Sequence, residues 1–453
     1  MSILKEEDKN SIITYLNSGV LITSNLVLIP LVIRGYNELE SAIYLLLPTL
    51  TVFASLLDFG YTSTLTRYIA NIWNKDASGI KRNLSEGWDD RSKEIEEFMT
   101  SQNSLFVILC SALLICLPLA SFLLLSRMIL ITDDSDLYIS FVIVYMTRVF
   151  VGFLVNRNIA VLLGMNRVYE TKKAELINVL IKNIVIAIIL YNTLSLFYVF
   201  MVDLLFVSLL YFHFTGVCRN IFKRGLFARF AWNKEVLNDF WKPSYKWGLM
   251  QLGSFGSNYS SNFIISNFGA PADITIFLVV IKVLNFIKLF TTTPVISNIP
   301  LFIKDYASNN LNAFRDRFLR QVKKGLLYGL VLNFSFILGA DLLFGFLEVP
   351  ISGMPKFFLM AGCIMVFLEC HHSMNAQAYM TSNRIAFVVP SLVTGGLIFL
   401  VSLYVVVYLE KTVYAIFIVQ LISQLLINNW YSVYLNLNLM NVRAKDYFRS
   451  LIF

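Results

Sequence analysis

QNSLFVILCSALLICLPLASFLLLS, residues 102–126, contains no charged residue and decides the fold class. A helix needs about 20 mainly apolar residues to cross the hydrocarbon core of a bilayer, and this stretch exceeds that length. Similar apolar blocks recur along the chain, separated by polar segments. A transmembrane β-barrel would instead show strands of about 10 residues that alternate in polarity. The pattern therefore predicts an all-α integral membrane protein.

Twelve such blocks are long enough to be transmembrane helices. In the first half of the chain, the predicted spans are 12–33, 41–66, 102–126, 137–164, 174–192 and 194–217. In the second half, they are 244–268, 273–302, 325–347, 356–381, 385–408 and 412–436. The span 244–268 is unusually polar for a helix that faces lipid. The chain is 57% hydrophobic and 15% charged, whereas soluble domains are roughly 45–50% apolar and about 25% charged.

The basic residues in the loops predict the orientation of these spans. If both termini are cytoplasmic, the outer loops hold four of the 37 Lys and Arg residues, namely Arg34, Arg127, Lys356 and Lys411. This asymmetry favours cytoplasmic termini, and the net charge of +8 then reflects the inner loops and not nucleic-acid binding. The first apolar stretch has full spanning length, so we expect no cleavable signal peptide. The five cysteines lie in or beside apolar stretches and are expected to be small buried hydrophobes.

The two halves of the chain resemble each other, and we divide it into six-helix bundles at 1–222 and 223–453. SAIYLLLPTLTVFASL at 41–56 aligns with ITIFLVVIKVLNFIKL at 274–289, and NIAVLLGMNR at 158–167 aligns with NAQAYMTSNR at 375–384. The matches fall in the second and eighth spans and in the fourth and tenth. Pseudo-symmetric halves related by an axis along the membrane normal enclose a central cavity in many transporters. The repeat therefore predicts a transporter.

Charged residues at membrane depth indicate where a polar cavity lies. A charge at the centre of a bilayer costs roughly 2.5–3.5 kcal/mol, so these side chains should face partners or water. The cations Lys282 and Lys288 share one stripe of the eighth span with Asn285. A cavity with fixed cations and amides suits a polyhydroxylated substrate that carries phosphate. The substrate-binding candidates are Arg148, Arg157, Lys282, Lys288, Asn285, Gln251, Asn258 and Asn25.

A second group of charged residues could form ion pairs or couple transport to an ion gradient. Lys182 and Asp203 lie at similar depth on consecutive antiparallel spans, which predicts an ion pair between them. Glu369 and His372 share a helical face, so a proton-handling pair and a hydrogen-bonded packing site are both open. The candidates for coupling or ion pairing are Asp58, Lys182, Asp203, Glu369 and His372. No metal site and no cofactor are expected, because no matching ligand set accompanies the histidines.

LLDFGYTSTLTRYIA at 56–70 overlaps the C-terminal end of the second predicted span and continues beyond it. It resembles the segment after the second helix in Wzx-type polysaccharide flippases of the multidrug/oligosaccharidyl-lipid/polysaccharide (MOP) superfamily, with Asp58, Gly60 and Arg67 at the matching positions. Twelve spans and a two-half repeat extend the resemblance over nearly the whole chain, whereas the lipid II flippases of this superfamily usually have fourteen helices.

This resemblance implies transport across the bacterial inner membrane. The cargo would be an undecaprenyl-pyrophosphate-linked oligosaccharide, such as an O-antigen repeat unit in lipopolysaccharide biosynthesis. The resemblance implies that the partners are membrane lipids and other polysaccharide-assembly membrane proteins. It implies no nucleic-acid partner.

Two other classes of protein share this composition. A small-molecule efflux antiporter of the same superfamily is the main alternative, although antiporters that export cationic drugs favour acidic cavities. A membrane enzyme such as a sugar polymerase or ligase would need a substantial external catalytic loop, and the predicted outer loops are short. No GxxxxGK[ST] phosphate-binding loop occurs in the chain. We therefore predict a transporter and not an enzyme.

Overall fold

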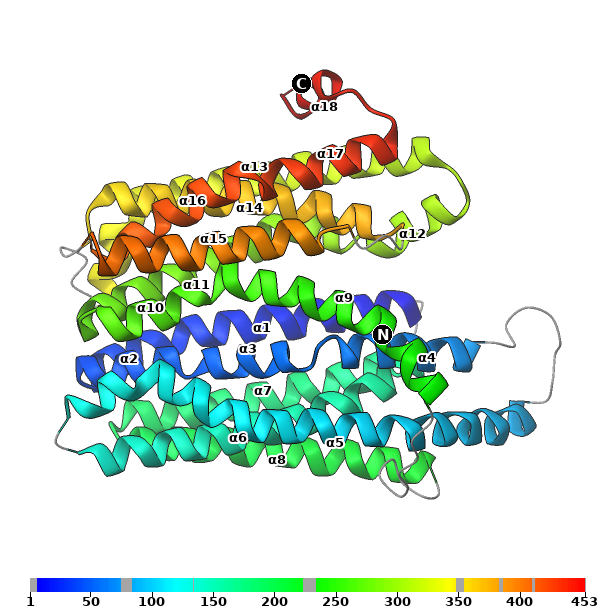
Figure 1. The fold of residues 1–453 in the computed structure, drawn as a ribbon, viewed down its shortest axis with the longest axis horizontal. Coiled ribbons are helices and arrows are strands. Elements are labelled where there is room, and N and C mark those ends of the chain that lie inside the picture. Colours follow the sequence, from blue (N-terminus) through cyan, green and yellow to red (C-terminus); the bar gives the residue numbers. More distant parts are fainter. Residues whose placement is uncertain are drawn as a thin grey trace. The chain divides into compact units, whose positions relative to one another are not determined.

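The computed structural model describes residues 6–74, 84–132, 134–222, 234–347, 354–382, 386–409 and 412–452. All regular elements in these ranges are helices, as Figure 1 shows. Helices satisfy their backbone hydrogen-bonding groups internally, which a lipid environment requires. The all-α fold class predicted from the apolar blocks is therefore confirmed.

The helices in the first part of the chain are α1 (Glu6–Gly35), α2 (Glu38–Leu46), α3 (Pro48–Leu57), α4 (Tyr61–Asn74), α5 (Leu84–Leu130), α6 (Ser135–Gly164), α7 (Val168–Tyr191) and α8 (Leu196–Ile221). Those in the second part are α9 (Lys234–Asn258), α10 (Ser260–Phe268), α11 (Pro271–Ile296), α12 (Ile299–Ala307), α13 (Leu311–Phe346), α14 (Lys356–Met380), α15 (Val388–Val407), α16 (Ile416–Leu426), α17 (Asn428–Met440) and α18 (Ala444–Ile452).

Ten helical segments of the described residues are long and apolar enough to cross a membrane. They correspond to α2 with α3, α5, α6, α7, α8, α11 with α12, α13, α14, α15, and the segment Val413–Met440 that holds α16 and α17. The chain is therefore a multi-pass membrane protein. The two remaining predicted spans, 12–33 and 244–268, fall on α1 and on α9 with α10, which lie outside these ten.

The predicted span 41–66 is wrong at its C-terminal end, because α3 stops at Leu57 and α4 starts as a separate helix at Tyr61. Phe59 and Gly60 both have positive φ, at 47° and 73°, which no continuous right-handed helix allows. A Cβ at Gly60 would lie 2.7 Å from the Cβ of Trp247, so only glycine fits this turn.

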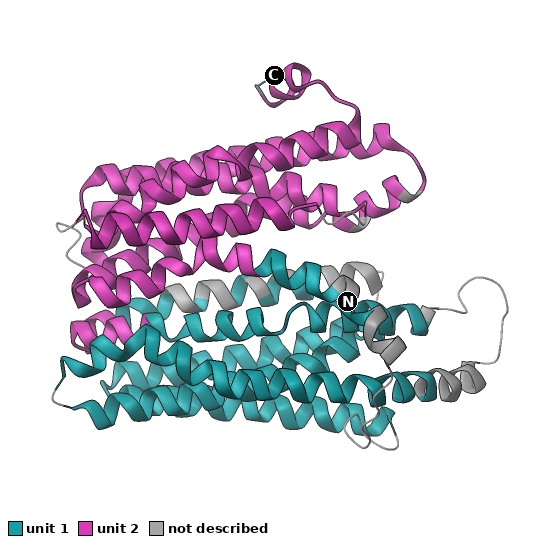
Figure 2. Cartoon of the chain, viewed as in Figure 1, with its two compact units in different colours: residues 1–31, 46–251 teal, residues 32–45, 252–453 magenta. Residues whose placement is uncertain are grey.

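The chain forms two compact units, which Figure 2 shows in different colours. Unit 1 comprises residues 1–31 and 46–251. Within it, α6 packs closely along α8 and also contacts α3, α4, α5 and α7. Aromatic rings fill the interior: the centroids of the stacked pair Phe106 and Phe153 are 5.5 Å apart, as are those of the tilted pair Phe141 and Phe200.

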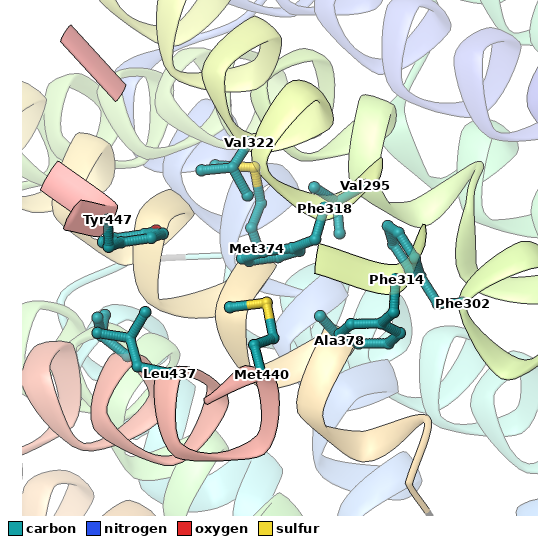
Figure 3. Close-up of a cluster of buried hydrophobic side chains, with 11 residues drawn as sticks. Val295, Phe302, Phe314, Phe318, Val322, Met374, Ala378, Leu437, Met440 and Tyr447 are labelled. Carbon is teal, nitrogen blue, oxygen red and sulfur yellow. The ribbon is translucent and has the colours of Figure 1, made fainter. Parts of the chain in front are cut away.

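Unit 2 comprises residues 32–45 and 252–453. Within it, α14 packs against α11, α13, α16 and α17. An apolar cluster near α18 holds these helices together, and Figure 3 shows its side chains. Its members are Val295, Phe302, Phe314, Phe318, Val322, Met374, Ala378, Val433, Leu437, Met440 and Tyr447.

The two compact units do not coincide with the sequence halves 1–222 and 223–453. The division falls inside α9, after Gln251, and residues 32–45 belong to unit 2. The first part of α9 groups with unit 1 because Trp247 and Gly248 pack against the α3–α4 turn at Gly60 and Phe59. The two pseudo-symmetric bundles and the central cavity stay predictions.

Candidate functional site

A cavity of about 250 Å³ lies inside unit 2. Its walls come from the end of α9 and from α11, α14 and α16, and they combine hydroxyl, amide and charged groups with a few apolar side chains. The lining residues are Ser254, Ser257, Asn258, Tyr259, Ile281, Leu284, Asn285, Lys288, Met365, Val366, Glu369, Gln420 and Gln424. Three predicted substrate-binding residues, Asn258, Asn285 and Lys288, therefore meet here, together with Glu369 from the coupling group.

Lys288 on α11 and Glu369 on α14 form an ion pair in this cavity. Their side chains are 27% and 13% exposed, so both charges are largely desolvated. The sequence analysis named Lys288 as a substrate-binding cation, and in the structure its charge is balanced by Glu369. The pair joins positions 81 residues apart, and the signal that could have revealed it was an acid and a base at mid-depth in two different spans.

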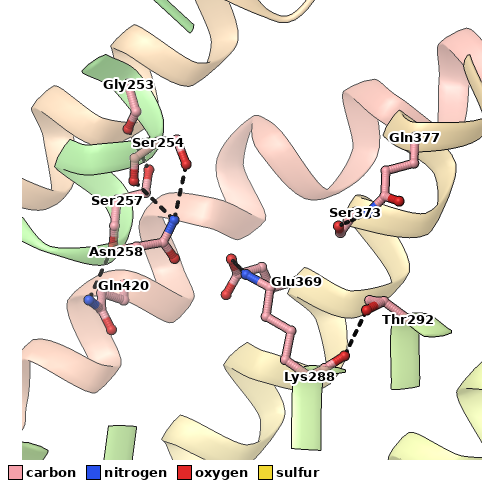
Figure 4. Close-up of polar contacts among 10 residues, drawn as sticks. All are labelled: Gly253, Ser254, Ser257, Asn258, Lys288, Thr292, Glu369, Ser373, Gln377 and Gln420. Carbon is pink, nitrogen blue, oxygen red and sulfur yellow. Dashed lines mark hydrogen bonds and ion pairs between the residues drawn. The ribbon is translucent and has the colours of Figure 1, made fainter. Parts of the chain in front are cut away.

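The opposite wall carries neutral polar groups, as Figure 4 shows. The Nδ2 of Asn258 donates to the backbone oxygen of Ser254 at 2.9 Å, and the Nε2 of Gln420 donates to the backbone oxygen of Ser257 at 3.3 Å. The Oε1 atoms of Gln420 and Gln424 are buried without a partner among the described residues. This wall can therefore still accept hydrogen bonds from a ligand.

Lys282 lies apart from this cavity, although it shares α11 with Lys288. At 100° per residue, the lining residues Ile281, Asn285 and Lys288 occupy one face of α11, and Lys282 points about 60–120° away from each of them. No ion pair or hydrogen bond of the Lys282 side chain is found within the described residues. The structure thus separates the two lysines that the sequence placed on one stripe.

Unit 1 contains a second charged group at mid-depth. Asp203 on α8 accepts from the Nε of Arg148 at 2.7 Å and from the Nζ of Lys182 at 2.8 Å. The pair predicted between Lys182 and Asp203 is present, and Arg148 joins it. A further bond runs from the Nη1 of Arg148 to the Oγ1 of Thr51 at 3.3 Å, and this hydroxyl also meets the hydroxyl of Tyr145 at 3.1 Å. Two cations share one carboxylate, so this triad carries an excess positive charge.

Arg157 is placed differently from the prediction of a substrate-binding cation. Its side chain is fully buried, hydrogen-bonds the Oδ1 of Asn103 on α5, and stacks on the ring of Phe106 at 4.6 Å. Cation–π contact and hydrogen bonding replace the lost hydration of the guanidinium. Arg157 therefore holds α5 against α6 and has no surface to offer a ligand.

The residues that carry the resemblance all have local structural contacts in unit 1. Asp58 accepts from the backbone N and the hydroxyl of Thr62 at 3.1 and 2.7 Å, which caps the start of α4. Gly60 forms the turn described above. The guanidinium of Arg67 lies over the ring of Trp247 at 5.3 Å. Asp58 thus orients α4 and forms no ion pair among the described residues.

His372 makes no hydrogen bond to Glu369, which pairs with Lys288 instead. Its ring packs edge-on against Phe387 at 6.3 Å. The sequence reading missed a role for its neighbour: the Nε2 of His371 lies 2.7 Å from the hydroxyl of Tyr447 on α18. That hydroxyl also accepts from the Nδ2 of Asn375 at 3.2 Å.

Two further predicted residues and the repeat motif can also be placed. Gln251 on α9 belongs to unit 1, and its Oε1 is buried without a partner among the described residues. The side chain of Asn25 lies outside the described residues, as do the repeat residues Asn383 and Arg384. The repeat partners Asn158 and Asn375 are both buried and hydrogen-bonded, Asn158 to Thr215 at 3.0 Å.

Solved structures of other proteins share the fold of this chain. No protein-family model and no curated protein sequence matches it. Among solved structures, it is similar to an inward-facing multidrug resistance MATE family transporter of the MOP superfamily, with a TM-score of 0.67 and 15% identity over 95% of this chain and 96% of that one. An outward-facing structure of such a transporter matches with a TM-score of 0.64 and 15% identity over 96% and 95%.

A third similar structure is a MOP superfamily transporter from Pyrococcus furiosus Vc1 (DSM3638), described as having a binding pocket of reverse polarity that suggests a different function. Its TM-score is 0.60, with 15% identity over 96% of this chain and 95% of that one. At this identity, the likeness establishes a shared fold. The protein therefore has the fold of MATE transporters of the MOP superfamily.

Proposed function

We propose that this protein is a flippase of the Wzx type in the bacterial inner membrane. It moves an undecaprenyl-pyrophosphate-linked oligosaccharide, such as an O-antigen repeat unit, from the cytoplasmic to the periplasmic leaflet by alternating access, and both its termini are cytoplasmic. The observation that carries this proposal is the cavity of unit 2, whose charges are balanced and whose remaining polar groups are amides and hydroxyls.

Such a lining suits a sugar better than an apolar ligand. Sugar hydroxyls both donate and accept hydrogen bonds, and the free Oε1 atoms of Gln420 and Gln424 accept while the amide of Asn285 can do both. Ligand pockets usually measure about 300–1,000 Å³, so a cavity of about 250 Å³ takes one part of a glycan at a time. The polyisoprenoid tail would remain in the lipid.

The triad of Arg148, Lys182 and Asp203 supports the same substrate class through its charge. Its excess positive charge favours an anion over a cation. Pyrophosphate and acidic sugars supply such charge, whereas a cationic drug would be repelled. The flippase proposal therefore rests on neutral polar groups in unit 2 and on a net cation in unit 1.

Reconstitution tests the proposal directly. Proteoliposomes that contain a fluorescent undecaprenyl-pyrophosphate oligosaccharide should expose the glycan to an external glycosidase faster than protein-free vesicles do. Lys288→Ala should slow this exposure, whereas Lys356→Gln, at an ion pair whose side chains are 77% and 62% exposed, should not. Equal exposure with and without protein would refute the proposal.

Small-molecule efflux is the second candidate, and the carboxylate of Glu369 in the cavity favours it. The similar structures of the MATE family are described as multidrug resistance transporters. If the protein exports cationic drugs, cells that produce it should expel a fluorescent cation such as ethidium, and the double variant Lys288→Gln with Glu369→Gln, which keeps the cavity neutral, should abolish the expulsion. Ethidium retention equal to that of cells without the protein, combined with glycan exposure in vesicles, would exclude this candidate.

A further inference from the structure

Polar side chains recur at every fourth position along α16 and α17 of unit 2. At 100° per residue, each member is turned only about 40° from the one before it, so together they form a continuous stripe that winds along the two helices, which we call the polar row. Its members are Gln420, Gln424, Asn428, Ser432 and Asn436. The opposite face of the same two helices is apolar and exposed: Ile422, Leu426 and Trp430 are 53%, 68% and 52% exposed. The polar row therefore points into the unit, away from the surface that lipid would cover.

Each member of the polar row keeps a buried atom that has no hydrogen-bond partner among the described residues. These atoms are Oε1 of Gln420 and Gln424, Oδ1 of Asn428 and Asn436, and Oγ of Ser432. Both side-chain polar atoms of the adjacent Asn429 share this condition. Buried polar groups in native proteins are almost always satisfied, and ordered water satisfies those that no protein group reaches. A run of such atoms along one stripe is therefore a chain of water-binding groups.

The helix geometry adds further polar groups at the middle of the polar row. Ile427 separates α16 from α17 with φ −133° and ψ −58°, so the regular backbone hydrogen bonding is interrupted there. His372 on α14 lies beside the backbone of Asn428, and its Nδ1 is buried without a partner among the described residues. The centre of the polar row therefore has polar groups on two packed elements.

The two ends of the polar row are anchored in known features. At one end, Gln420 and Gln424 line the cavity together with Glu369. At the other, the Nδ2 of Asn436 donates to the Oδ1 of Asn375 at 3.1 Å, and Asn375 donates to Tyr447 on α18. Sixteen residues at 1.5 Å each give a length of about 24 Å. The polar row thus extends from the cavity to the end of unit 2 where α18 is attached.

We propose that the polar row binds a continuous file of water molecules, which connects the cavity at Glu369 with the end of unit 2 at Tyr447. The ligand class is water, because the lining consists of uncharged amides, a hydroxyl and an imidazole with no carboxylate among them. This assignment does not depend on what the protein transports. It gives the cavity at Glu369 a route for water through the interior of unit 2 towards α18.

Thiol accessibility to the silver ion, which is scarcely larger than a water molecule, tests the file. Gln424→Cys, Asn428→Cys and Ser432→Cys place thiols in the polar row, and Ile422→Cys, Leu426→Cys and Trp430→Cys place matched thiols on the exposed face of the same helices. Each variant is held in lipid nanodiscs, treated with silver nitrate, then unfolded and alkylated. Mass spectrometry of the peptides reports which thiols silver had already blocked, so the native cysteines need no replacement.

We expect silver ions to block thiols in the polar row at least ten times faster than thiols on the exposed face of the same helices. Ser432→Cys changes a single atom, so its result stands even if another variant fails to fold. Block at Gln424→Cys alone would mean that water stops at the cavity wall and would overturn the file. Equal rates on both faces, or no block at any position, would overturn it too.

Discussion

Lys288 and Glu369 meet as an ion pair inside unit 2, on helices α11 and α14, with 27% and 13% of their side chains exposed. Removing one partner of a buried pair leaves an isolated charge, whereas removing both leaves a neutral contact. Both the stability of unit 2 and the chemistry of its cavity therefore depend on the two residues together.

Single and double substitutions should consequently differ in stability. Lys288→Gln or Glu369→Gln alone should cost about 3–5 kcal/mol, and the double variant should cost much less. Thermal denaturation followed by fluorescence-detected size-exclusion chromatography ranks the stabilities of the wild-type protein and the variants. Lys356→Gln, at the exposed pair with Asp341, is the matched control and should change stability by about 0–1 kcal/mol. Additive losses in the double variant would contradict the coupling.

The two lysines of α11 should differ in function. Lys288→Ala should lower surface polysaccharide in a complementation assay about ten- to hundred-fold, since a charge-assisted contact is worth roughly 1.5–3 kcal/mol. Lys288→Arg should keep part of the activity, because the charge stays while its geometry changes. Lys282→Ala should have a smaller effect, because Lys282 does not line the cavity. A larger loss for Lys282→Ala, at equal protein abundance, would place the substrate elsewhere.

The membrane-spanning helices could be predicted from the sequence, because the length of an apolar stretch can be seen without knowing how the helices pack. Ten of the predicted spans therefore fall on helices long enough to cross a membrane. The pair of Lys182 and Asp203 was predictable because consecutive antiparallel helices bring similar depths together. Lys288 and Glu369 are 81 residues apart on helices that are not consecutive, so only the packing of α11 on α14 reveals their contact.

Interruptions within helices were not predictable from hydropathy. The turn at Gly60 lies in a block that reads as continuous, and the break at Ile427 lies in another. Arg157 was misjudged because its burial depends on Asn103 and Phe106, which come from another helix. Hydropathy measures how apolar a segment is, and these features depend on which side chain a neighbouring helix supplies.

The triad of unit 1 should tolerate loss of a cation better than loss of its acid. Arg148→Gln leaves the balanced pair of Lys182 and Asp203, whereas Asp203→Asn leaves two adjacent cations without an anion. We expect Asp203→Asn to lower stability by about 3–5 kcal/mol and Arg148→Gln by clearly less. Denaturation midpoints in one detergent provide the measurement. If Arg148→Gln were the more damaging change, the arginine would be mainly a packing residue.

The turn at Gly60 should not accept a side chain. Gly60→Ala combines a φ of 73° with a Cβ that would lie 2.7 Å from that of Trp247, so it should cost about 1–3 kcal/mol or more. Gly216→Ala in α8 is the control, since nothing lies within 4 Å of its Cβ, and it should stabilise the helix by about 0.5–1 kcal/mol. Opposite shifts in melting temperature are therefore expected, and equal shifts would mean that residue 60 does not need the left-handed conformation.

Glu369 is the acid best placed to couple transport to a proton gradient. It lines the cavity and pairs with Lys288, Tyr259 lies in the same cavity wall, and His372 follows it by about one turn on α14. Protonation of the Glu369 carboxylate would remove its negative charge and break its ion pair with Lys288. The ammonium group of Lys288 could then interact with the substrate. Coupling of this kind needs the carboxyl group of Glu369, so the transport rate of a protein without Glu369 should be independent of the pH gradient.

Glu369→Gln alone cannot test this cleanly, because it leaves Lys288 without its counterion and can unfold unit 2. The double variant Lys288→Gln with Glu369→Gln keeps the cavity neutral and should fold. In proteoliposomes, we expect translocation by wild-type protein to accelerate several-fold when a pH gradient is imposed, and translocation by the double variant to be slow and equal with and without the gradient. Asn428→Leu should reduce the acceleration while leaving the basal rate, because it interrupts the polar row that leads to Glu369. A double variant that still responded to the gradient as wild type does would exclude Glu369 as the coupling acid and leave its pair with Lys288 as a packing contact.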